Sequence, residues 1–495
     1  MGQDIKNCQF TPSDFTHFRE LVQRELETLK EVLQMPGFGQ GSASVGAELE
    51  YYIVDEEGHA SGINHHLLES CKGKGMQAEL NRFNIEHNLL PQPLTGTPFA
   101  LLESEMGSQW LRLNELAAQH KARLVPIGIL PTLRKSDFGP HSMTNQPRYV
   151  ALAEGLRQMR GKPFEVSIHG RESLEICTDD VTLEGANTSF QFHWRVAPEL
   201  FVATYNAVQL LTPLYVALNA NSPFLLYHDL WDETRIALFK QSVDVRAESG
   251  DCWRSPARVD FGQGWLRTSP VELFEQAVAL YPPLLPSICE ETGLSEGNRQ
   301  KLPPLNNLKL HQGTTWAWNR AIYDSSQNGH LRIELRAMPA GPTIKDMLAT
   351  AAFTIGCAQQ LTDHVNTMIT QLPFKYAEHN FYTAAKKSLS ASLIWPDPGQ
   401  MGLSEKPITD IIAQLLPLAA RGLIAMGVDE KEASGLMEII ALRLAKKQNG
   451  ASWQRSVVHQ LERRMDRKSA CTEMFSLYRF NQARGLPVAE WKDTP

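Results

Sequence analysis

The feature that most constrains the fold is an alternating segment near the N-terminus, residues 45–55, with the sequence VGAELEYYIVD. With a period of two residues, one face carries Ala47, Leu49, Tyr51 and Ile53, and the other carries Glu48, Glu50, Tyr52 and Val54. This pattern predicts a β-strand with an apolar back. Glu48 and Glu50 would lie roughly 6–7 Å apart on its front. Such carboxylates repel, so they indicate a nearby divalent cation or arginine pair, or else a solvated strand face.

Two later segments, residues 188–196 and 331–339, repeat this design of an apolar back and an ionisable front. Their fronts carry, in chain order, Gln191, His193, Arg195, Arg332, Glu334 and Arg336. A sheet that packs helices on one face needs an apolar back, but it does not need charged groups gathered on the other face. Three such fronts in one chain therefore predict a shared site on the front of the sheet.

The composition is that of a soluble protein, with 42% hydrophobic and 21% charged residues in a chain of 495. A net charge of −7 argues against nucleic acid or an anionic membrane as the main partner. We find no uninterrupted apolar segment of about 18 residues and no secretory h-region, so we expect a cytoplasmic location. The seven cysteines are scattered without a CxxC pair, which predicts thiols in a reducing compartment rather than a zinc site.

Periodicity predicts the remaining elements. We expect helices over residues 11–35, 97–122, about 150–159, 198–219 and 343–370, a buried strand over 124–131, a loop or hairpin over 246–269, and mostly helix from 407 onward. An acidic segment, residues 79–88, offers Glu79 and Glu86 as further site candidates. The glycines of residues 37–41 precede a strand instead of following one, so they predict a connector and not a nucleotide loop.

The residue types on the three fronts indicate the chemistry. Carboxylates with one imidazole and no thiolate suit Mg²⁺ or Mn²⁺. Arginines beside such ions suit a polyphosphate, which they bind bidentately. The combination is typical of phosphoryl transfer. Because the chain has no Walker loop, a nucleotide would be held in some other way.

These motifs resemble those of the glutamine synthetase-like carboxylate–amine ligases, and in particular the glutamate–cysteine ligases of the second family. The resemblance rests on Glu48-x-Glu50, on Gln191-x-His193 and on Arg332-x-Glu334-x-Arg336. It is supported by Pro147-Arg148-Tyr149, by residues 219–224 and by residues 449–453, and it runs from about residue 43 to the end.

The resemblance implies an α+β fold, in which a curved, mainly antiparallel sheet forms a funnel-shaped site with helices packed outside. It implies three parts: an N-terminal helix and linker (1–42), a catalytic domain (43–400) and a helical C-terminal segment (401–495). ATP would enter at one end of the funnel, and the amino-acid substrates would enter at the other.

The resemblance also implies roles for individual residues. Two or three Mg²⁺ ions, or Mn²⁺, would be held by Glu48, Glu50, Glu86, His193 and Glu334. Arg320 and Arg336 would be the catalytic residues that contact the phosphates of ATP. Gln191 and Arg235 would contact the nucleotide, and Arg148 and Tyr149 would contact the substrate.

The expected activity is ATP-dependent amide formation through an acyl phosphate, with glutamate as acyl donor and cysteine as the first choice of acceptor, as in glutathione biosynthesis. Residues 246–269 would exclude water from the acyl phosphate. The alternatives are a ligase for another amine, a guanidino-type phosphotransferase, and a non-catalytic ATP-binding regulator. We expect small-molecule partners only, and a homo-oligomer is compatible with the sequence.

Overall fold

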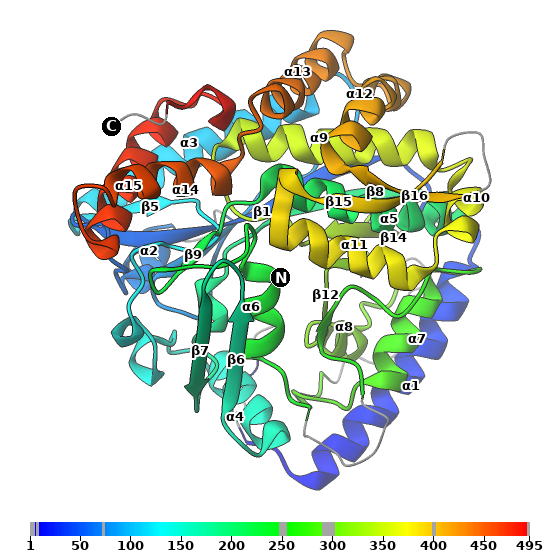
Figure 1. Ribbon diagram of the computed structural model, residues 1–495. Coiled ribbons are helices and arrows are strands. Elements are labelled where there is room, and N and C mark those ends of the chain that lie inside the picture. The colour runs from blue at the N-terminus through cyan, green and yellow to red at the C-terminus, as the bar shows by residue number, and fades with distance from the viewer. Residues whose placement is uncertain are drawn as a thin grey trace.

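The computed structural model describes residues 5, 9–71, 75–246, 255–289, 302–397 and 402–492. Its centre is a strongly curled, eight-stranded sheet in the order β13–β14–β8–β1–β3–β2, with β4 and β5 paired to other parts of β1 (Figure 1). The strands are β1 (Ser44–Asp55), β2 (Met76–Ala78), β3 (Asn84–Asn88), β4 (Gln92–Pro93), β5 (Ala122–Val125), β8 (Phe190–Val196), β13 (Asn319–Asp324) and β14 (His330–Leu335). Every pairing in this sheet is antiparallel, which confirms the predicted fold class.

Strand β1 organises the sheet because it is long enough to pair with four other strands. It meets β8 over residues 44–49, β3 over 48–52, β5 over 52–55 and β4 at its start. Its predicted back lies in the main hydrophobic core, as the alternation requires. The end of its front is buried in a second core, where the Tyr52 hydroxyl donates to the Ala186 carbonyl over 2.6 Å. Only Glu48 and Glu50 of that front therefore line a cavity.

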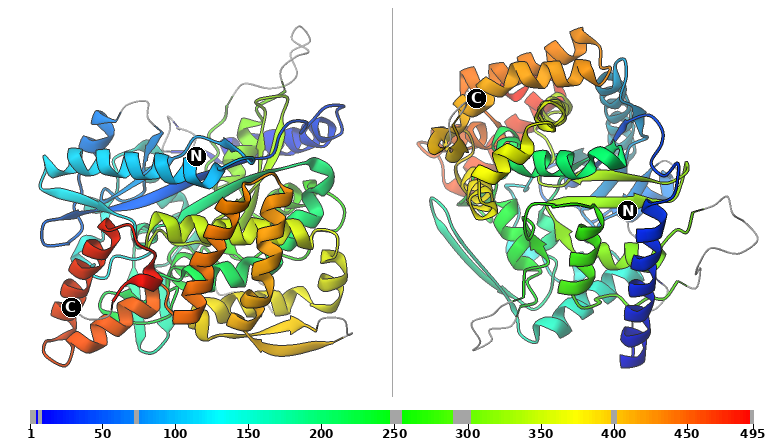
Figure 2. Two further views of the ribbon diagram at one scale, coloured as in Figure 1. Left: turned by 90° about the horizontal axis from the view of Figure 1, so that it is seen from above. Right: turned by 90° about the vertical axis from the view of Figure 1, so that its right-hand side faces the viewer.

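Helices lie on both sides of the sheet, and the two sides differ (Figures 1 and 2). The apolar side carries α3 (Pro98–Ala118), α5 (Phe201–Asn219), α9 (Ile344–Leu361), α12 (Ile408–Ala425) and α13 (Glu430–Lys446). The side that holds the cavity carries α4 (Pro147–Arg160), α6 (Arg235–Ser242) and α8 (Asn306–Gln312). The cavity thus lies between the sheet and these three helices.

The N-terminal helix α1 (Pro12–Leu33) packs against α7 (Val271–Leu280) and α8. Thr11 caps it in a capping box with Asp14. The buried carboxylate of Glu25 accepts hydrogen bonds from Asn307 and from the Leu308 amide at the start of α8. Helix α1 therefore supports a helix that lines the cavity.

The C-terminal helices α14 (Gly450–Leu461) and α15 (Arg467–Ala483) cover the second core, where Trp453, Tyr478 and Trp491 pack edge to face or tilted. The other elements are α2 (Asn64–Ser70), β6 (Phe164–His169), β7 (Ser173–Thr178), β9 (Phe224–Leu225), β10 (His228–Asp229), β11 (Val259–Asp260), β12 (Trp316–Ala317), α10 (Val365–Gln371), α11 (Phe374–Lys387), β15 (Ser392–Pro396) and β16 (Leu403–Pro407).

Several predicted boundaries were wrong. The strand expected over 124–131 ends at Val125, because Pro126 has no N–H to continue the ladder. The expected helix over 343–370 is two helices, α9 and α10, separated at residues 362–364. The helix expected over 97–122 ends at Ala118, and the strand expected over 331–339 ends at Leu335. Within 246–269, residues 247–254 lie outside the described part, and β11 occupies residues 259–260.

Two segments are long and apolar enough, by length and composition alone, to cross a membrane. The first, Pro198–Asn219, is 83% buried inside the protein and includes the core helix α5. The second, Ile408–Ala425, is α12, which buries one face against α9. Both segments therefore pack as helices of the protein core.

Candidate active site

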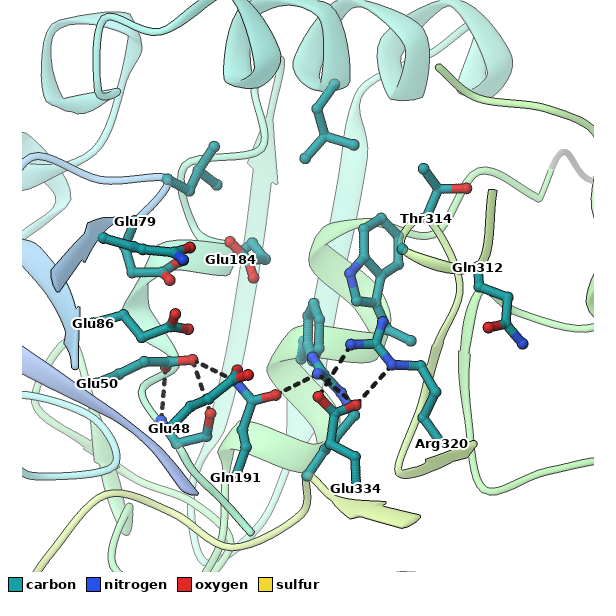
Figure 3. A pocket seen from close by; sticks show the side chains of 18 of the residues that line it. Glu48, Glu50, Glu79, Glu86, Glu184, Gln191, Gln312, Thr314, Arg320 and Glu334 are labelled. Atoms are coloured by element: carbon teal, nitrogen blue, oxygen red, sulfur yellow. Dashed lines mark hydrogen bonds and ion pairs between the residues drawn. The ribbon is translucent and has the colours of Figure 1, made fainter. Parts of the chain in front are cut away.

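A cavity of about 490 Å³ opens on the ionisable front of the sheet (Figure 3). It brings together ten of the predicted site residues: Glu48, Glu50, Glu86, Arg148, Tyr149, Gln191, Arg235, Arg320, Glu334 and Arg336. The eleventh, His193, does not line the cavity itself but contacts two residues that do, Glu48 and Glu334. Side chains from all three predicted strand fronts therefore lie in or beside one cavity.

The first acidic group consists of Glu48, His193 and Glu334. Strand β8 lies between β1 and β14, so His193 is opposite Gly46 on one side and Glu334 on the other. Its Nε2 atom is 3.2 Å from Glu48 Oε1 and 3.8 Å from Glu334 Oε1. The imidazole and these two carboxylates thus form one buried, closely spaced cluster. One ligand atom from each residue lies within 4.8 Å of the others, which fits a single bound cation.

The second acidic group consists of Glu50, Glu79 and Glu86. Glu50 faces Glu86 across the β1–β3 pair, and Glu79 enters from the turn after β2. Burial, followed by the charge of Glu86, raises the pKa of Glu50 to about 7. Burial with Glu86 and Glu50 raises the pKa of Glu79 well above its usual range. A bound cation would relieve the repulsion that opposes joint ionisation of these three carboxyls.

Arg320 and Arg336 flank the first acidic group. Arg320 binds Glu334 bidentately, with Nε–Oε2 at 2.7 Å and Nη2–Oε1 at 3.1 Å, and Arg336 Nη1 lies 3.2 Å from Glu334 Oε2. Burial opposes ionisation of Glu334, but the two guanidinium groups hold its pKa well below the usual range. These two arginines therefore share one carboxylate, which leaves them a net positive charge directed at the cavity.

Gln191 joins the two acidic groups. Its side-chain oxygen accepts a hydrogen bond from Arg336, and its Nε2 donates to Glu50 Oε1 over 3.0 Å. Glu50 also accepts from the Ser189 amide and hydroxyl. The line Glu334–Arg336–Gln191–Glu50 fixes the acidic groups relative to each other, so they form one site.

Three other predicted residues line the cavity, and two of them, Arg235 and Tyr149, are partly committed elsewhere. Arg235 is 2% exposed, pairs with Glu233 at 2.9 Å and donates to the Ala337 carbonyl. The Tyr149 hydroxyl donates to the Ala78 carbonyl over 2.5 Å. The Nε atom of Arg148 is buried without a hydrogen-bond partner among the described residues. Their roles in binding stay predictions.

Sequence reasoning missed Glu184, which lies in a short 3₁₀ turn (Glu184–Ala186) and lines the cavity near Glu79 and the second acidic group (Figure 3). Burial, and then the charge of Glu50, raises its pKa to about 8. A single glutamate in a turn has no periodicity, so no sequence signal could have found it. Lys309 on α8 and the apolar parts of α4 and α6 also line the cavity and were not predicted. The described part of residues 246–269 does not line it.

The donor set fits hard divalent cations. The two groups supply five carboxylates and one imidazole, with no thiolate, and the ligand atoms within each group lie close enough to share one ion. Mg²⁺ and Mn²⁺ prefer such oxygen-rich sets. The adjacent arginines add the positive charge that a polyphosphate needs.

Comparison with known proteins gives a consistent result. Residues 44–261 match the glutamate–cysteine ligase family 2. A protein of Rhodococcus jostii (strain RHA1), provisionally named glutamate–cysteine ligase 2-1, is 29% identical over 38% of this chain and 43% of its own length. A Frankia alni (strain DSM 45986 / CECT 9034 / ACN14a) protein of the same provisional name is 21% identical over 79% of this chain and 86% of its own length.

Among solved structures, the glutamate–cysteine ligase of Francisella tularensis in complex with AMP superposes with a TM-score of 0.50. The superposition covers 92% of this chain and 91% of that chain at 12% identity, so it concerns the fold alone. Over residues 44–261, which are less than half of the chain, the protein is therefore similar to the glutamate–cysteine ligase family 2.

Proposed function

We propose that the protein joins the side-chain carboxylate of a glutamate-like substrate to an amine, with cleavage of ATP to ADP and phosphate. The observation that carries this proposal is the joining of the two acidic groups by Arg336 and Gln191 within one cavity. Transfer of a phosphoryl group between two anions needs cations on both sides of the transferring group, and this arrangement could supply them.

In this proposal, Glu48, His193 and Glu334 hold one Mg²⁺ ion, and Glu50, Glu79 and Glu86 hold a second. When bound, such ions screen the negative charges of the phosphates and the carboxylate and polarise the transferring phosphoryl group. Arg320 and Arg336 bind the phosphate oxygens. Both arginines are already positioned by Glu334, so little reorganisation is needed when substrate enters.

The reaction has two steps. A substrate carboxylate oxygen attacks the γ-phosphorus of ATP, the bond to the bridging oxygen of ADP breaks, and an acyl phosphate forms. The nitrogen of the amine then attacks the acyl carbon, phosphate leaves with the C–O bonding electrons, and the amine loses a proton to give the amide. The acyl phosphate is needed because a free carboxylate has no adequate leaving group.

Glutamate is the proposed acyl donor, and cysteine is the first acceptor to test, because the relatives are named for that pair. The product would then be γ-glutamylcysteine, a precursor in glutathione biosynthesis. We place this activity in the cytoplasm with small-molecule partners.

The test is to incubate the protein with ATP, Mg²⁺ and glutamate, with and without each amine of a panel, and to follow phosphate release and product mass. Amine-dependent phosphate release with an amide product of the expected mass supports the ligase. Transfer of phosphate to a stable acceptor without phosphate release would favour a phosphotransferase. ATP left intact with every amine would reject both activities.

A further inference from the structure

Two carboxylates line the cavity outside the two acidic groups, Asp324 and Glu184. Asp324 pairs with Arg332, whereas the Glu184 carboxylate has no hydrogen bond or ion pair to another described residue. Its strongest electrostatic neighbours are Glu50, which repels it, and Arg336, which is already engaged with Glu334 and Gln191. A buried carboxyl group with no cationic partner resists ionisation, and a ligand that brings positive charge would stabilise its ionised form. An amino group is the positively charged part of the expected substrates.

The cavity wall beside Glu184 is apolar, and two helices build it. Helix α4 presents Tyr149, Leu152 and Leu156 at spacings of three and four residues, so these side chains share one face. Helix α6 and the residue that ends it present Arg235, Phe239 and Val243 at spacings of four. On both helices the polar residue comes first and the apolar residues follow.

Two further residues complete this wall. Val181 precedes Glu184 by three residues and lines the cavity from the same turn. Leu285 also lines the cavity, and its neighbour Leu284 lies against Gly155 of α4. We define the amine compartment as the part of the cavity bounded by Leu152, Leu156, Val181, Phe239, Val243 and Leu285, with Glu184 at its polar end.

The positive charges of the cavity indicate where the nucleotide lies. Lys309 comes from α8, Arg320 from β13 and Arg332 from β14, and Arg336 directly follows β14, so these four charges lie on one side of the acidic groups. The α4–α6 side has Arg148 and Arg235, and Arg235 is already paired with Glu233. A triphosphate is therefore attracted to the β13–β14 side. The α4–α6 side is left for the amino substrates.

We propose that the amine compartment binds a primary amine with a branched or aromatic apolar substituent, so that Glu184 holds the amino group while Leu156 and Phe239 contact the substituent. The acceptor is then larger and more apolar than cysteine. This inference rests on the proposed ligase function for its chemistry, and it adds the class of the acceptor.

The first test compares acceptors with ATP, Mg²⁺ and glutamate held at saturation. Each buried methylene contributes about 0.8 kcal/mol, so two more of them raise kcat/KM by about tenfold. We therefore expect leucine, phenylalanine, isoamylamine or phenethylamine to exceed cysteine and ethanolamine by at least that factor. A kcat/KM for cysteine equal to or above those of all the apolar amines would overturn the inference.

The second test uses two variants. Glu184→Gln should raise the KM for the amine by about tenfold or more while leaving the KM values for ATP and glutamate within about twofold, because one charge-assisted hydrogen bond is lost. Leu156→Ala should reduce the preference for large apolar amines over ethanolamine. The matched controls are Glu154→Gln on the outer side of α4 and Leu461→Ala, which removes a buried leucine on α14 outside the cavity. Both controls should keep the acceptor preference of the unmodified protein.

The outcomes separate this inference from the proposed function. A rise in the KM for ATP in both variants would assign the compartment to the nucleotide and overturn the inference. If no amine supports turnover, calorimetry with phenethylamine, Mg²⁺ and a non-hydrolysable ATP analogue tests whether the amine compartment binds an apolar amine. If phenethylamine binds, and Glu184→Gln and Leu156→Ala both weaken that binding, the amine compartment is supported although the ligase is rejected. If phenethylamine does not bind, the amine compartment is rejected as well.

Discussion

Glu334→Gln is the most informative single substitution, because Glu334 contacts the imidazole and both arginines of the first acidic group. It is 1% exposed and accepts three charge-assisted contacts of 2.7–3.2 Å from Arg320 and Arg336. Removing one partner of a buried ion pair destabilises a protein by about 3–5 kcal/mol. Glutamine still accepts one hydrogen bond, so we expect the free energy of unfolding to fall by about 3 kcal/mol.

That loss is small relative to the size of the chain. Unfolding entropy is about 2.1 cal/mol/K per residue, which gives about 1 kcal/mol/K for 495 residues. The Tm should therefore fall by about 3 °C, and the circular dichroism spectrum should be unchanged. Turnover should fall by at least about a thousandfold, because a proposed cation ligand and the anchor of two arginines proposed to bind phosphate are lost together.

The assays are thermal unfolding and amine-dependent phosphate release. Glu272→Gln is the matched control, since it also removes a buried, multiply hydrogen-bonded carboxylate, but one that lies outside the cavity on α7. The control should lose stability and keep turnover. Activity within a few-fold of the unmodified protein in Glu334→Gln would refute the placement of β14 in the active site.

Three further predictions follow from other parts of the molecule. A Cβ on Gly422 would lie 1.9 Å from a backbone oxygen of α9, so Gly422→Ala should destabilise the protein by about 1–3 kcal/mol. Gly435 has open space around it, so Gly435→Ala should be neutral or stabilising by up to about 1 kcal/mol. Equal shifts in Tm for the two variants would contradict the close packing at Gly422. Protons held by Glu50 and Glu79 must leave when Mg²⁺ or Mn²⁺ binds, so calorimetry in two buffers of different ionisation enthalpy should detect proton release. The affinity for the cation should then rise about tenfold per pH unit below about pH 7 for each proton released. An affinity that does not depend on pH would reject the second acidic group as a cation site. Burial raises the pKa of Asp260 to about 6, so between pH 4 and 6 the folded protein keeps a proton that the unfolded chain, with a pKa near 3.8, has lost. The free energy of unfolding should therefore fall by up to about 3 kcal/mol as the pH rises from 4 to 6. Asp260→Asn should flatten the dependence of unfolding free energy on pH over that range.

The sequence predicted the sheet well because the signal of a strand is local. Alternation in residues 45–55, 188–196 and 331–336 shows which side chains share a face without any knowledge of the partner strands. It also placed Glu48, His193 and Glu334 on strand fronts, and the strand pairing then brought them within 4.8 Å. The resemblance contributed Arg320, whose own segment carries no motif as specific.

Boundaries were predicted less well because they depend on groups beyond the segment. The strand ending at Val125 continues in sequence as an apolar run, and only the absence of an N–H at Pro126 and the lack of a partner strand stop it. The break between α9 and α10 lies within a stretch whose periodicity alone gave no reason to stop.

The sequence by itself determined the ionisable fronts of the strands and the chemical character of the site, because strand periodicity and residue type are properties of short segments. Only the tertiary structure decided which groups meet. It grouped Glu79 with Glu50 and Glu86, added Glu184 from a turn, committed Arg235 to Glu233, and placed apolar faces of α4 and α6 beside the acidic groups. The physical reason is that strand register, helix packing and burial are set by contacts between residues far apart in the chain, and these contacts determine which carboxylates are paired and which are left for a ligand.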